Sequence, residues 1–279
     1  MTPREAVFVV AVAAVLAVAS GCAMAAGGSP STSAAADPGA STTVELTVYG
    51  AASLKEALAA VATAYEIAVP GTALTIATDS SATLRAQIEQ GAPADLFLSA
   101  DEQNPQALVD ARLTDGAAVD FASNTLVIVV PLDNPAGIAT PADLARPGVK
   151  IVAAGDEVPI SGYARQLVDR LAALDGYPAD FASAYAANVV SKEENVKAVV
   201  AKIELGEADA AIAYVTDAAA SSGRVAAIAI PPGVNVAADY AGVVVKASPH
   251  AAAAHTFLDW LAGPGGSAIL ATFEFGPPG

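Results

Sequence analysis

The chain has 279 residues, of which 54% are hydrophobic, and it carries a formal net charge of −16 at pH 7. This length allows one or two domains with a substantial core, and so acidic a chain is a poor partner for nucleic acid. Ala and Val supply most of the hydrophobic fraction, aromatic residues are few, and long runs of charge are absent from the sequence, which favours an α/β protein behind a leader segment.

Residues 1–21 have the features of a secretion signal. Arg4 is followed by an apolar run over residues 7–18, and the small residues 19–21 lead into Cys22, the only cysteine. The segment is too short for a confident transmembrane helix and ends like a cleavage site. The pattern resembles a bacterial lipobox, although Ala19 stands where Leu is commoner. We therefore predict an extracytoplasmic lipoprotein anchored to the cell membrane through Cys22, the alternative being a plain signal peptide with an incidental cysteine.

Residues 22–43 form a tract rich in Gly, Ser, Ala, Pro and Thr without apolar periodicity. Such a composition cannot bury enough surface to fold, so the tract is predicted to be a flexible linker between membrane and domain.

Residues 46–49 have the composition of a strand, and the small residues 50–52 form the turn that follows it. Beyond the turn, Leu54, Leu58, Val61 and Tyr65 have helical spacing. Ser53 precedes this helix, where Ser is a favoured N-cap. The start of the folded part is therefore predicted to be a strand, a tight turn and a capped helix.

Short apolar runs and helical patterns then alternate, as in an α/β fold with a largely parallel sheet. We expect the run at 124–130 to cross into a second lobe and the run at 239–246 to return to the first. The predicted lobes are residues 44–125 with 236–279, and residues 126–235. Further predicted strands lie at 73–78, 94–100, 150–155 and 208–214, and further predicted helices at 82–90, from 101, over 163–171, over 196–203 and over 251–261.

Four small or polar junctions introduce predicted helices: Ser53, Ser80-Ser81, Ile160-Ser161 and Asn195-Val196. Two belong to each predicted lobe. Helix N-termini present free N–H groups and a positive dipole end, and α/β sheets place ligands beyond the carboxyl ends of their strands. If the lobes face each other, the junctions would form a site for a compact anion without Lys or Arg.

Several strings around these junctions resemble the extracytoplasmic molybdate-binding proteins of bacterial ABC transporters. They are residues 51–58 (AASLKEAL), 80–101 (SSATLRAQIEQGAPADLFLSAD), 155–164 (GDEVPISGYA), 194–197 (ENVK) and 211–218 (AIAYVTDA). The resemblance covers about residues 44–275. It implies a two-lobed periplasmic-binding-protein fold, type II-like, that is monomeric, holds molybdate or tungstate in the interlobe cleft, uses no cofactor and delivers its ligand to a membrane permease.

The family's ligand-binding positions correspond to Ser53 and Ser81 through their hydroxyls, Ile160 and Val196 through their backbone N–H groups, and Tyr214 through its phenol. The third junction departs from the family pattern, because the segment before Val158 is slightly shorter and Ser161-Gly162 replaces a more typical pair. The donor there is a main-chain N–H, so only its position in the loop is open.

These donors predict selectivity for fully deprotonated oxyanions. Hydrogen phosphate keeps a proton that needs an acceptor, and leaving it unpaired costs about 1–3 kcal/mol. Sulfate meets the same donors and remains the alternative ligand, because cavity size cannot be taken from the sequence.

Plainer structural roles are open for some of these residues. Ser81 could be no more than a helix cap, and Tyr214 could be no more than an aromatic residue that packs against the core. We expect Lys55, Arg85 and Lys197 in solvent, His250 and His255 at the surface, and Asp95 and Asp101 in loop-shaping roles.

Two other functions fit less well. A serine hydrolase would be expected to carry a Gly-x-Ser-x-Gly elbow, which the sequence lacks. A ferric-iron binder would call for clustered Tyr, His and carboxylate ligands, whereas the junctions offer hydroxyls and amides. The sequence therefore predicts a binding protein and not an enzyme, with no metal site beyond the molybdate oxyanion itself.

Overall fold

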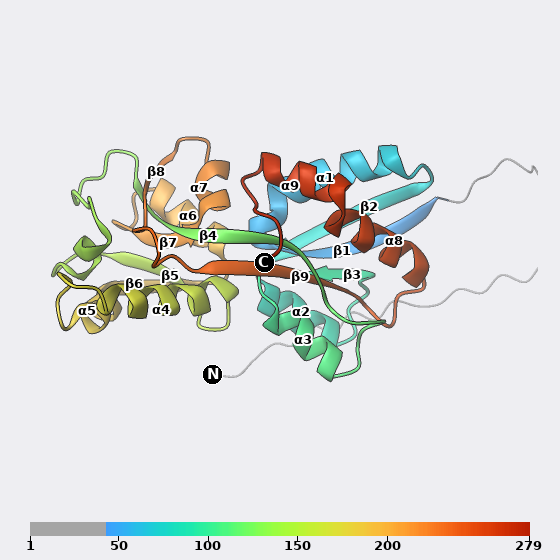
Figure 1. Cartoon of the computed structure of the whole chain (residues 1–279), viewed down its shortest axis with the longest axis horizontal. Helices are drawn as coiled ribbons and strands as arrows, with labels where there is room; N and C mark the ends of the chain where they lie inside the picture. The colour runs from blue at the N-terminus through green and yellow to red at the C-terminus, as the bar shows by residue number, and fades with distance from the viewer. Residues whose placement is uncertain (1–42) are drawn as a thin grey trace, which may run out of the picture. The chain divides into compact units, whose positions relative to one another are not determined.

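Strands and helices alternate along residues 43–279, which are the residues that the computed structural model describes (Figure 1). The strands are β1 (Val44–Ala51), β2 (Thr72–Asp79), β3 (Leu96–Leu98), β4 (Val119–Pro131), β5 (Ile151–Ala154), β6 (Val189–Glu193), β7 (Ala211–Tyr214), β8 (Val225–Ile228) and β9 (Ala237–Val244). The α-helices are α1 (Lys55–Ala68), α2 (Ser81–Glu89), α3 (Gln103–Asp110), α4 (Pro159–Ala172), α5 (Phe181–Asn188), α6 (Val196–Glu204), α7 (Val215–Ala220), α8 (Ala251–Ala262) and α9 (Pro264–Thr272). Two short 3₁₀ turns are η1 (Ala52–Leu54) and η2 (Pro141–Ala145). The predicted signal segment, linker and Cys22 lie outside these residues.

The main sheet of the described residues has the order β2-β1-β3-β9-β4-β7, with β8 also paired to β4. β1 runs parallel to β2 and β3, whereas β9 is antiparallel to β3 and β4, and β4 is antiparallel to β7 and β8. β5 and β6 form a separate parallel pair. The expectation of a largely parallel sheet was therefore wrong, because β9 runs opposite to both β3 and β4, and β7 and β8 run opposite to β4, which makes the sheet mixed.

β4 changes its pairing partner halfway along its length. Its first half pairs with β9 up to Thr125↔Ala237, and from Leu126↔Tyr214 onward it pairs with β7 and then β8. β4 and β9 lie side by side and run between the β1–β3 group and the β5–β8 group (Figure 1). The predicted crossover at residues 124–130 and the predicted return strand at 239–246 are thus both confirmed as strands.

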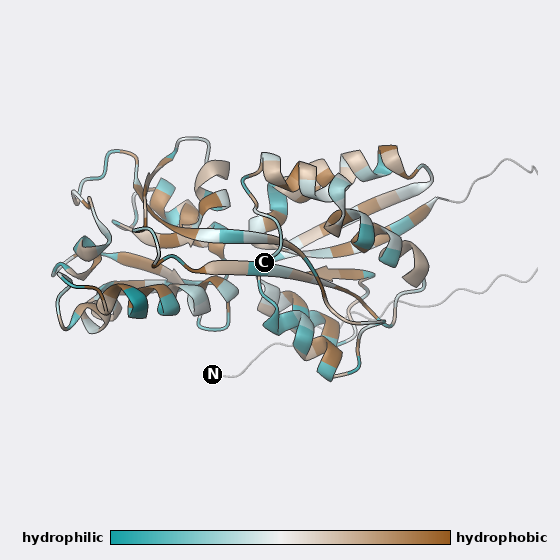
Figure 2. Ribbon diagram, viewed as in Figure 1, coloured by the Kyte–Doolittle hydropathy of each residue, from teal (hydrophilic) through white to brown (hydrophobic). Residues whose placement is uncertain are grey.

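The helices pack one hydrophobic face onto the sheets. Leu54, Leu58, Val61 and Tyr65 are all buried, as their spacing predicted. The Tyr65 ring contacts Phe257 and Trp260 of α8 edge-on, with ring centroids 4.9 and 5.1 Å apart. Figure 2 shows hydrophobic residues along the strands and hydrophilic residues on the outer side of α4. The core therefore ties α1 to α8, which lies near the C-terminal end of the chain.

The sequence left several short elements unpredicted. These are α5, α7, α9, β6 and β8, and the strand expected over 208–214 begins only at Ala211. None of the helices within residues 43–279 is long and apolar enough to cross a membrane.

Candidate functional site

All five ligand-binding residues predicted from the resemblance line one small cavity. These residues come from five separate segments of the chain: Tyr214 is the last residue of β7, and the other four, Ser53, Ser81, Ile160 and Val196, follow the carboxyl ends of β1, β2, β5 and β6. The structure therefore brings together residues spread over more than half of the sequence. The loop position that was open at the third junction does bring Ile160 into this cavity.

The tight turn after β1 positions Ser53. A side chain at Gly50 would collide with Leu58, so the absence of a Cβ lets α1 approach the end of β1 closely. Ser53 lies inside the 3₁₀ turn η1, and the residue that precedes α1 is Leu54, which makes no side-chain cap. The prediction that Ser53 caps the helix was therefore wrong, because the extra turn moves the start of α1 to Lys55. The buried Ser53 hydroxyl lies 2.8 Å from the Tyr240 hydroxyl instead.

Ser80 and Ser81 divide two roles between them. Ser80 is the N-cap of α2, and its hydroxyl accepts the Thr83 N–H at 3.1 Å. Ser81 is the first residue of the helix, and its buried hydroxyl oxygen accepts the Ala100 N–H at 3.0 Å. The capping role considered for Ser81 thus belongs to its neighbour. The Ser81 proton is left to point elsewhere, and the cavity that it lines is the available direction.

The other side of the cavity is built from two helix N-termini. Val158 precedes α4, Pro159 is its first residue, and Ile160 follows. Asn195 caps α6 by accepting the Ala198 N–H at 3.0 Å, and Val196 is the first helical residue. The first N–H groups of a helix have no acceptor within the helix. The Ile160 and Val196 amides are therefore free to donate to a bound molecule.

Tyr214 brings a buried hydroxyl to the same place. It ends β7 with 1% of its surface exposed, and its hydroxyl has no hydrogen-bond partner among the described residues. Burial raises the pKa of this phenol well above its ordinary value, and the neighbouring Tyr240 adds to the shift. The phenol is thus protonated at neutral pH and can donate a hydrogen bond.

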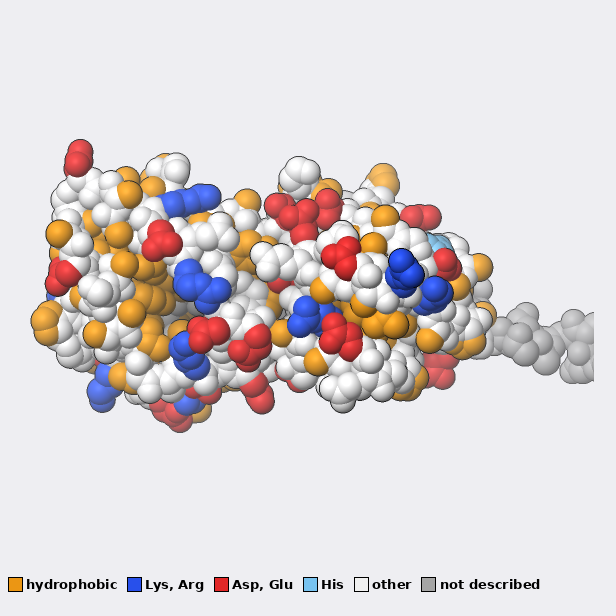
Figure 3. Space-filling model, turned by 90° about the horizontal axis from the view of Figure 1, so that it is seen from below, with side chains coloured by type: hydrophobic (Ala, Val, Ile, Leu, Met, Phe, Trp, Pro, Cys, Tyr) orange, Lys and Arg blue, Asp and Glu red, His pale blue; other side chains and the backbone are white. Residues whose placement is uncertain are grey.

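The cavity is uncharged apart from the helix dipoles. Among the described residues, no Asp, Glu, Lys or Arg side chain lines it. On the face of the molecule shown in Figure 3, acidic and basic side chains lie interspersed rather than in one large patch of a single sign. The site can therefore attract an anion only through its hydroxyls, amides and helix dipoles.

One charged cluster lies next to the cavity. The Lys197 ammonium is 2.7 Å from the Glu56 carboxylate and 3.1 Å from the buried Asp217 carboxylate, with 24% of the Lys197 side chain exposed. The expectation that Lys197 lies in solvent was wrong, because this ion pair holds it against the protein. Beside it, the Asn195 amide donates to Asp79 at 3.2 Å.

Sequence reasoning missed three buried polar residues behind Ser53. Tyr240, Asn124 and Thr216 are each less than 5% exposed, and their polar groups are joined by hydrogen bonds. The sequence feature that could have indicated them is a polar side chain at the end of an otherwise apolar run, since a buried polar group needs a hydrogen-bond partner.

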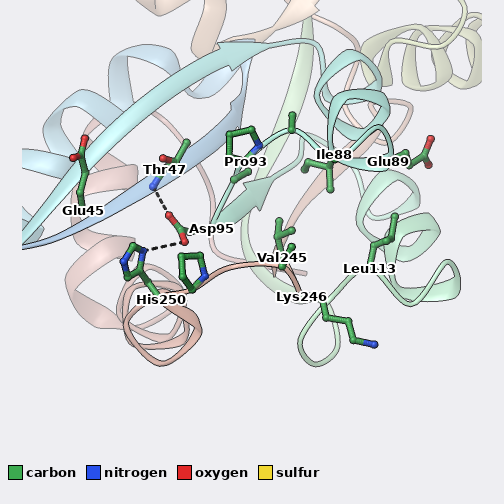
Figure 4. Close-up of a pocket in the computed structure, with 15 residues that line it drawn as sticks. Glu45, Thr47, Ile88, Glu89, Pro93, Asp95, Leu113, Val245, Lys246 and His250 are labelled. Atoms are coloured by element: carbon green, nitrogen blue, oxygen red, sulfur yellow. Dashed lines mark hydrogen bonds and ion pairs between the residues drawn. The ribbon is translucent and has the colours of Figure 1, made fainter.

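A larger cavity, of about 760 Å³, lies elsewhere and is lined by none of the five predicted residues (Figure 4). The Asp95 carboxylate points between Thr47 and His250 there. It accepts the Thr47 N–H at 2.7 Å and the Ser248 hydroxyl, and it lies 3.4 Å from His250. The predicted loop-shaping role of Asp95 is confirmed, because this carboxylate ties β1 to the loop before α8. Within residues 43–279, no cluster of three or more His, Cys, Asp or Glu could hold a metal ion.

Comparisons with known proteins identify the family and the fold of this chain. Residues 46–275 match the family model of the bacterial extracellular solute-binding proteins. The molybdate-binding protein ModA of Mycobacterium tuberculosis is 33% identical over 233 residues, which cover 84% of this chain and 85% of that protein. ModA of Escherichia coli is 31% identical over 241 residues, covering 83% and 88%.

Two solved structures share the fold. The periplasmic molybdate-binding protein of Azotobacter vinelandii has a TM-score of 0.71 and 22% identity, and the match covers 84% of this chain and all of that one. The sulfate-binding protein SubI of Mycobacterium tuberculosis has a TM-score of 0.75 and 22% identity, covering 84% and 87%.

The chain belongs to the bacterial extracellular solute-binding protein family and has the α/β, two-lobed fold of periplasmic binding proteins. Within that family, its relatives above 30% identity are molybdate-binding proteins. The resemblance seen in the sequence is therefore confirmed.

Proposed function

We propose that this protein binds molybdate, and also tungstate, outside the cytoplasmic membrane and delivers it to the permease of an ABC transporter. The observation that carries the proposal is that five buried residues, each with a hydroxyl or a helix N-terminal N–H, line one small cavity without a carboxylate. The names of the relatives identify the oxyanion. The family is one of transport proteins, so we assign a binding role and no catalytic residue.

In this proposal each donor has a defined part. The Ser53 and Ser81 hydroxyls and the Tyr214 phenol donate from side chains, and the Ile160 and Val196 amides donate from helix N-termini. Hydrogen bonds to a charged group are worth about 1.5–3 kcal/mol each. Their sum allows tight binding of a dianion by an acidic protein without a cationic ligand.

The lobes that would close on the anion are residues 44–125 with 236–279, and residues 126–235. The change in pairing of β4 between Thr125 and Leu126 supports the first boundary, and the start of β9 at Ala237 supports the last. The Lys197–Glu56 ion pair and the Asn195–Asp79 hydrogen bond would then join the lobes beside the ligand. A ligand that contacts both lobes favours the closed arrangement.

The localisation part of the proposal rests on the N-terminal sequence. We propose that the mature protein is a monomeric lipoprotein, held at the outer face of the cytoplasmic membrane through a lipidated Cys22 and the linker 22–43. Two acyl chains give stable anchoring, and the linker leaves the binding domain free to reach its permease.

An anion panel tests the function. Molybdate and tungstate should raise the melting temperature strongly, since a ligand that binds only the folded state stabilises it by mass action. Phosphate should have little effect, because its proton would find no acceptor. Sulfate is the informative comparison, as it is deprotonated like molybdate but smaller. Stabilisation by phosphate equal to that by molybdate would overturn the proposal, and a stronger effect of sulfate would reassign the ligand.

A further inference from the structure

The Ser53 hydroxyl does not face the cavity alone. Its oxygen lies 2.8 Å from the Tyr240 hydroxyl oxygen, and both side chains are buried. Only one proton can occupy the space between the two oxygens. If Tyr240 donates it, the Ser53 proton remains available to the ligand; if Ser53 donates it, Ser53 can only accept from the ligand.

The orientation of the Asn124 side-chain amide indicates which of the two hydroxyls donates. Its side-chain oxygen accepts the Thr125 N–H at 2.9 Å, and because that backbone group can only donate, the amide orientation is fixed. The amide nitrogen therefore faces Thr216, 2.8 Å from its hydroxyl oxygen, and Tyr240, 3.4 Å from its hydroxyl oxygen. An amide N–H only donates, so the Tyr240 oxygen is on the accepting side of this contact.

The Tyr240 proton then has one available acceptor. Within the described residues, the Tyr240 hydroxyl forms hydrogen bonds only with Asn124 and Ser53, and Asn124 presents N–H to it. If Ser53 donated to Tyr240, the phenol proton would be buried without a partner, which costs about 1–3 kcal/mol. The favoured chain of donors therefore runs from Asn124 to Tyr240 and from Tyr240 to Ser53.

Ser81 is set in the same way by the backbone. Its hydroxyl oxygen accepts the Ala100 N–H at 3.0 Å, so its own proton is left for the cavity. Each serine oxygen thus already accepts one hydrogen bond, and its proton is available to the ligand. The Ser81 hydroxyl is oriented by a main-chain N–H, whereas the Ser53 hydroxyl is oriented by a side chain that can be substituted.

We propose that Tyr240, oriented by Asn124, is a positioning residue that fixes the Ser53 hydroxyl as a donor toward the bound anion and thereby sets selectivity for fully deprotonated oxyanions. This inference rests on the proposed function. A serine with no such neighbour could rotate and accept the proton of hydrogen phosphate. When Tyr240 donates to Ser53, accepting a second proton from hydrogen phosphate would leave the Ser53 proton without an acceptor, and this disfavours that arrangement.

Tyr240→Phe tests the proposal, because it keeps the ring that packs against Phe121, Tyr214 and Phe275. Titration calorimetry with molybdate and sulfate, and displacement of molybdate by phosphate, give the affinities for the variant and the wild type. Molybdate and sulfate binding should weaken together, and the molybdate-to-phosphate affinity ratio should fall at least tenfold. Tyr65→Phe, a buried tyrosine that packs against α8 away from the cavity, is the matched control and should leave the ratio unchanged.

Asn124→Asp provides an independent test by reversing the chain. A carboxylate oxygen in place of the amide nitrogen would accept the Tyr240 proton, so that Tyr240 would accept from Ser53 and Ser53 would lose its donor role. The added charge repels both dianions alike, and the affinity ratio therefore isolates the change in proton direction. The molybdate-to-phosphate ratio should again fall at least tenfold.

The role of Tyr240 and the proposed binding function can be overturned separately. If the wild type binds molybdate and both variants keep its molybdate-to-phosphate affinity ratio, the proposed role of Tyr240 is wrong. Wild-type protein that binds neither molybdate nor sulfate would overturn the proposed function itself. Additive effects of Tyr240→Phe and Ser53→Ala on molybdate affinity would also count against the proposal, since residues acting through one hydrogen bond must couple.

Discussion

The Tyr214 hydroxyl is a buried donor without a hydrogen-bond partner in residues 43–279, so its partner is expected to be the ligand. Tyr214→Phe should weaken molybdate binding by about 1.5–3 kcal/mol, roughly tenfold to a hundredfold, mainly through faster release. The ligand-free variant should be no less stable than the wild type, because the change removes an unpaired buried polar group. Stopped-flow release rates and urea unfolding measure the two effects. Wild-type release rates in the variant would reduce Tyr214 to a packing residue.

Ser80 and Ser81 are adjacent serines whose substitution separates helix capping from ligand binding. Ser80→Ala removes the helix cap and should cost about 1 kcal/mol of folding stability with little change in molybdate affinity. Ser81→Ala should instead lower the affinity roughly tenfold to a hundredfold, as expected for a lost hydrogen bond to a charged ligand. Calorimetric titration and chemical unfolding of both variants separate the roles. Equal affinity losses in the two would contradict this division.

The individual residues of the site could be proposed from the sequence because the strings around them resemble a known family, but their supports could not. Tyr240 lies 187 positions from Ser53, and Asn124 lies 92 from Thr216. Contacts at such separations depend on sheet order, and a sequence with a mixed sheet does not reveal that order. The expected cap at Ser53 failed for a local reason, the added 3₁₀ turn before α1.

At the scale of elements, α6 and α7 place Lys197 and Asp217 together, with Glu56 of α1 opposite. Burial raises the pKa of Asp217 from 3.8 to about 6, against the attraction of Lys197. The folded protein therefore binds this proton more tightly than the unfolded chain does. The stability contributed by the protonated carboxyl is fully present below about pH 4 and is lost as the pH rises through about 6.

Asp217→Asn tests that linkage. The difference of about two pKa units corresponds to about 3 kcal/mol, so the wild type should lose up to that much unfolding free energy relative to the variant between about pH 4 and 7. Urea unfolding of both proteins at intervals across this range gives the two curves. Parallel curves would mean that Asp217 is already ionised in the folded protein at acidic pH.

Long periodic elements were predicted better than short ones. The helix with Leu54, Leu58, Val61 and Tyr65 and the strand at 124–130 were recognised because their patterns repeat over several turns or residues. β6, with alternating intermediate and exposed positions, and the short helix α7 offer too few residues for a period to be read. The direction of the strands in the sheet was missed because antiparallel pairing of β4 and β9 depends on contacts between distant segments.

For the whole molecule, the N-terminal sequence predicts where it resides. Full-length protein should incorporate labelled fatty acid and sediment with membranes, whereas Cys22→Ser should do neither, because Cys22 is the sole thiol available for acylation. Metabolic labelling and membrane fractionation measure this. Equal labelling of the two forms would remove the lipoprotein assignment and leave the binding function untouched.

In the proposed complex, an uncharged cavity between two lobes holds the anion through five donors. Anomalous diffraction at the molybdenum absorption edge, from crystals of the molybdate complex, locates the anion. We expect one strong anomalous peak in the cavity, with oxyanion oxygens about 2.7–2.9 Å from the Ser53, Ser81 and Tyr214 hydroxyls and the Ile160 and Val196 amides. A peak in the large cavity beside Asp95 and His250, or a carboxylate in contact with the anion, would contradict it.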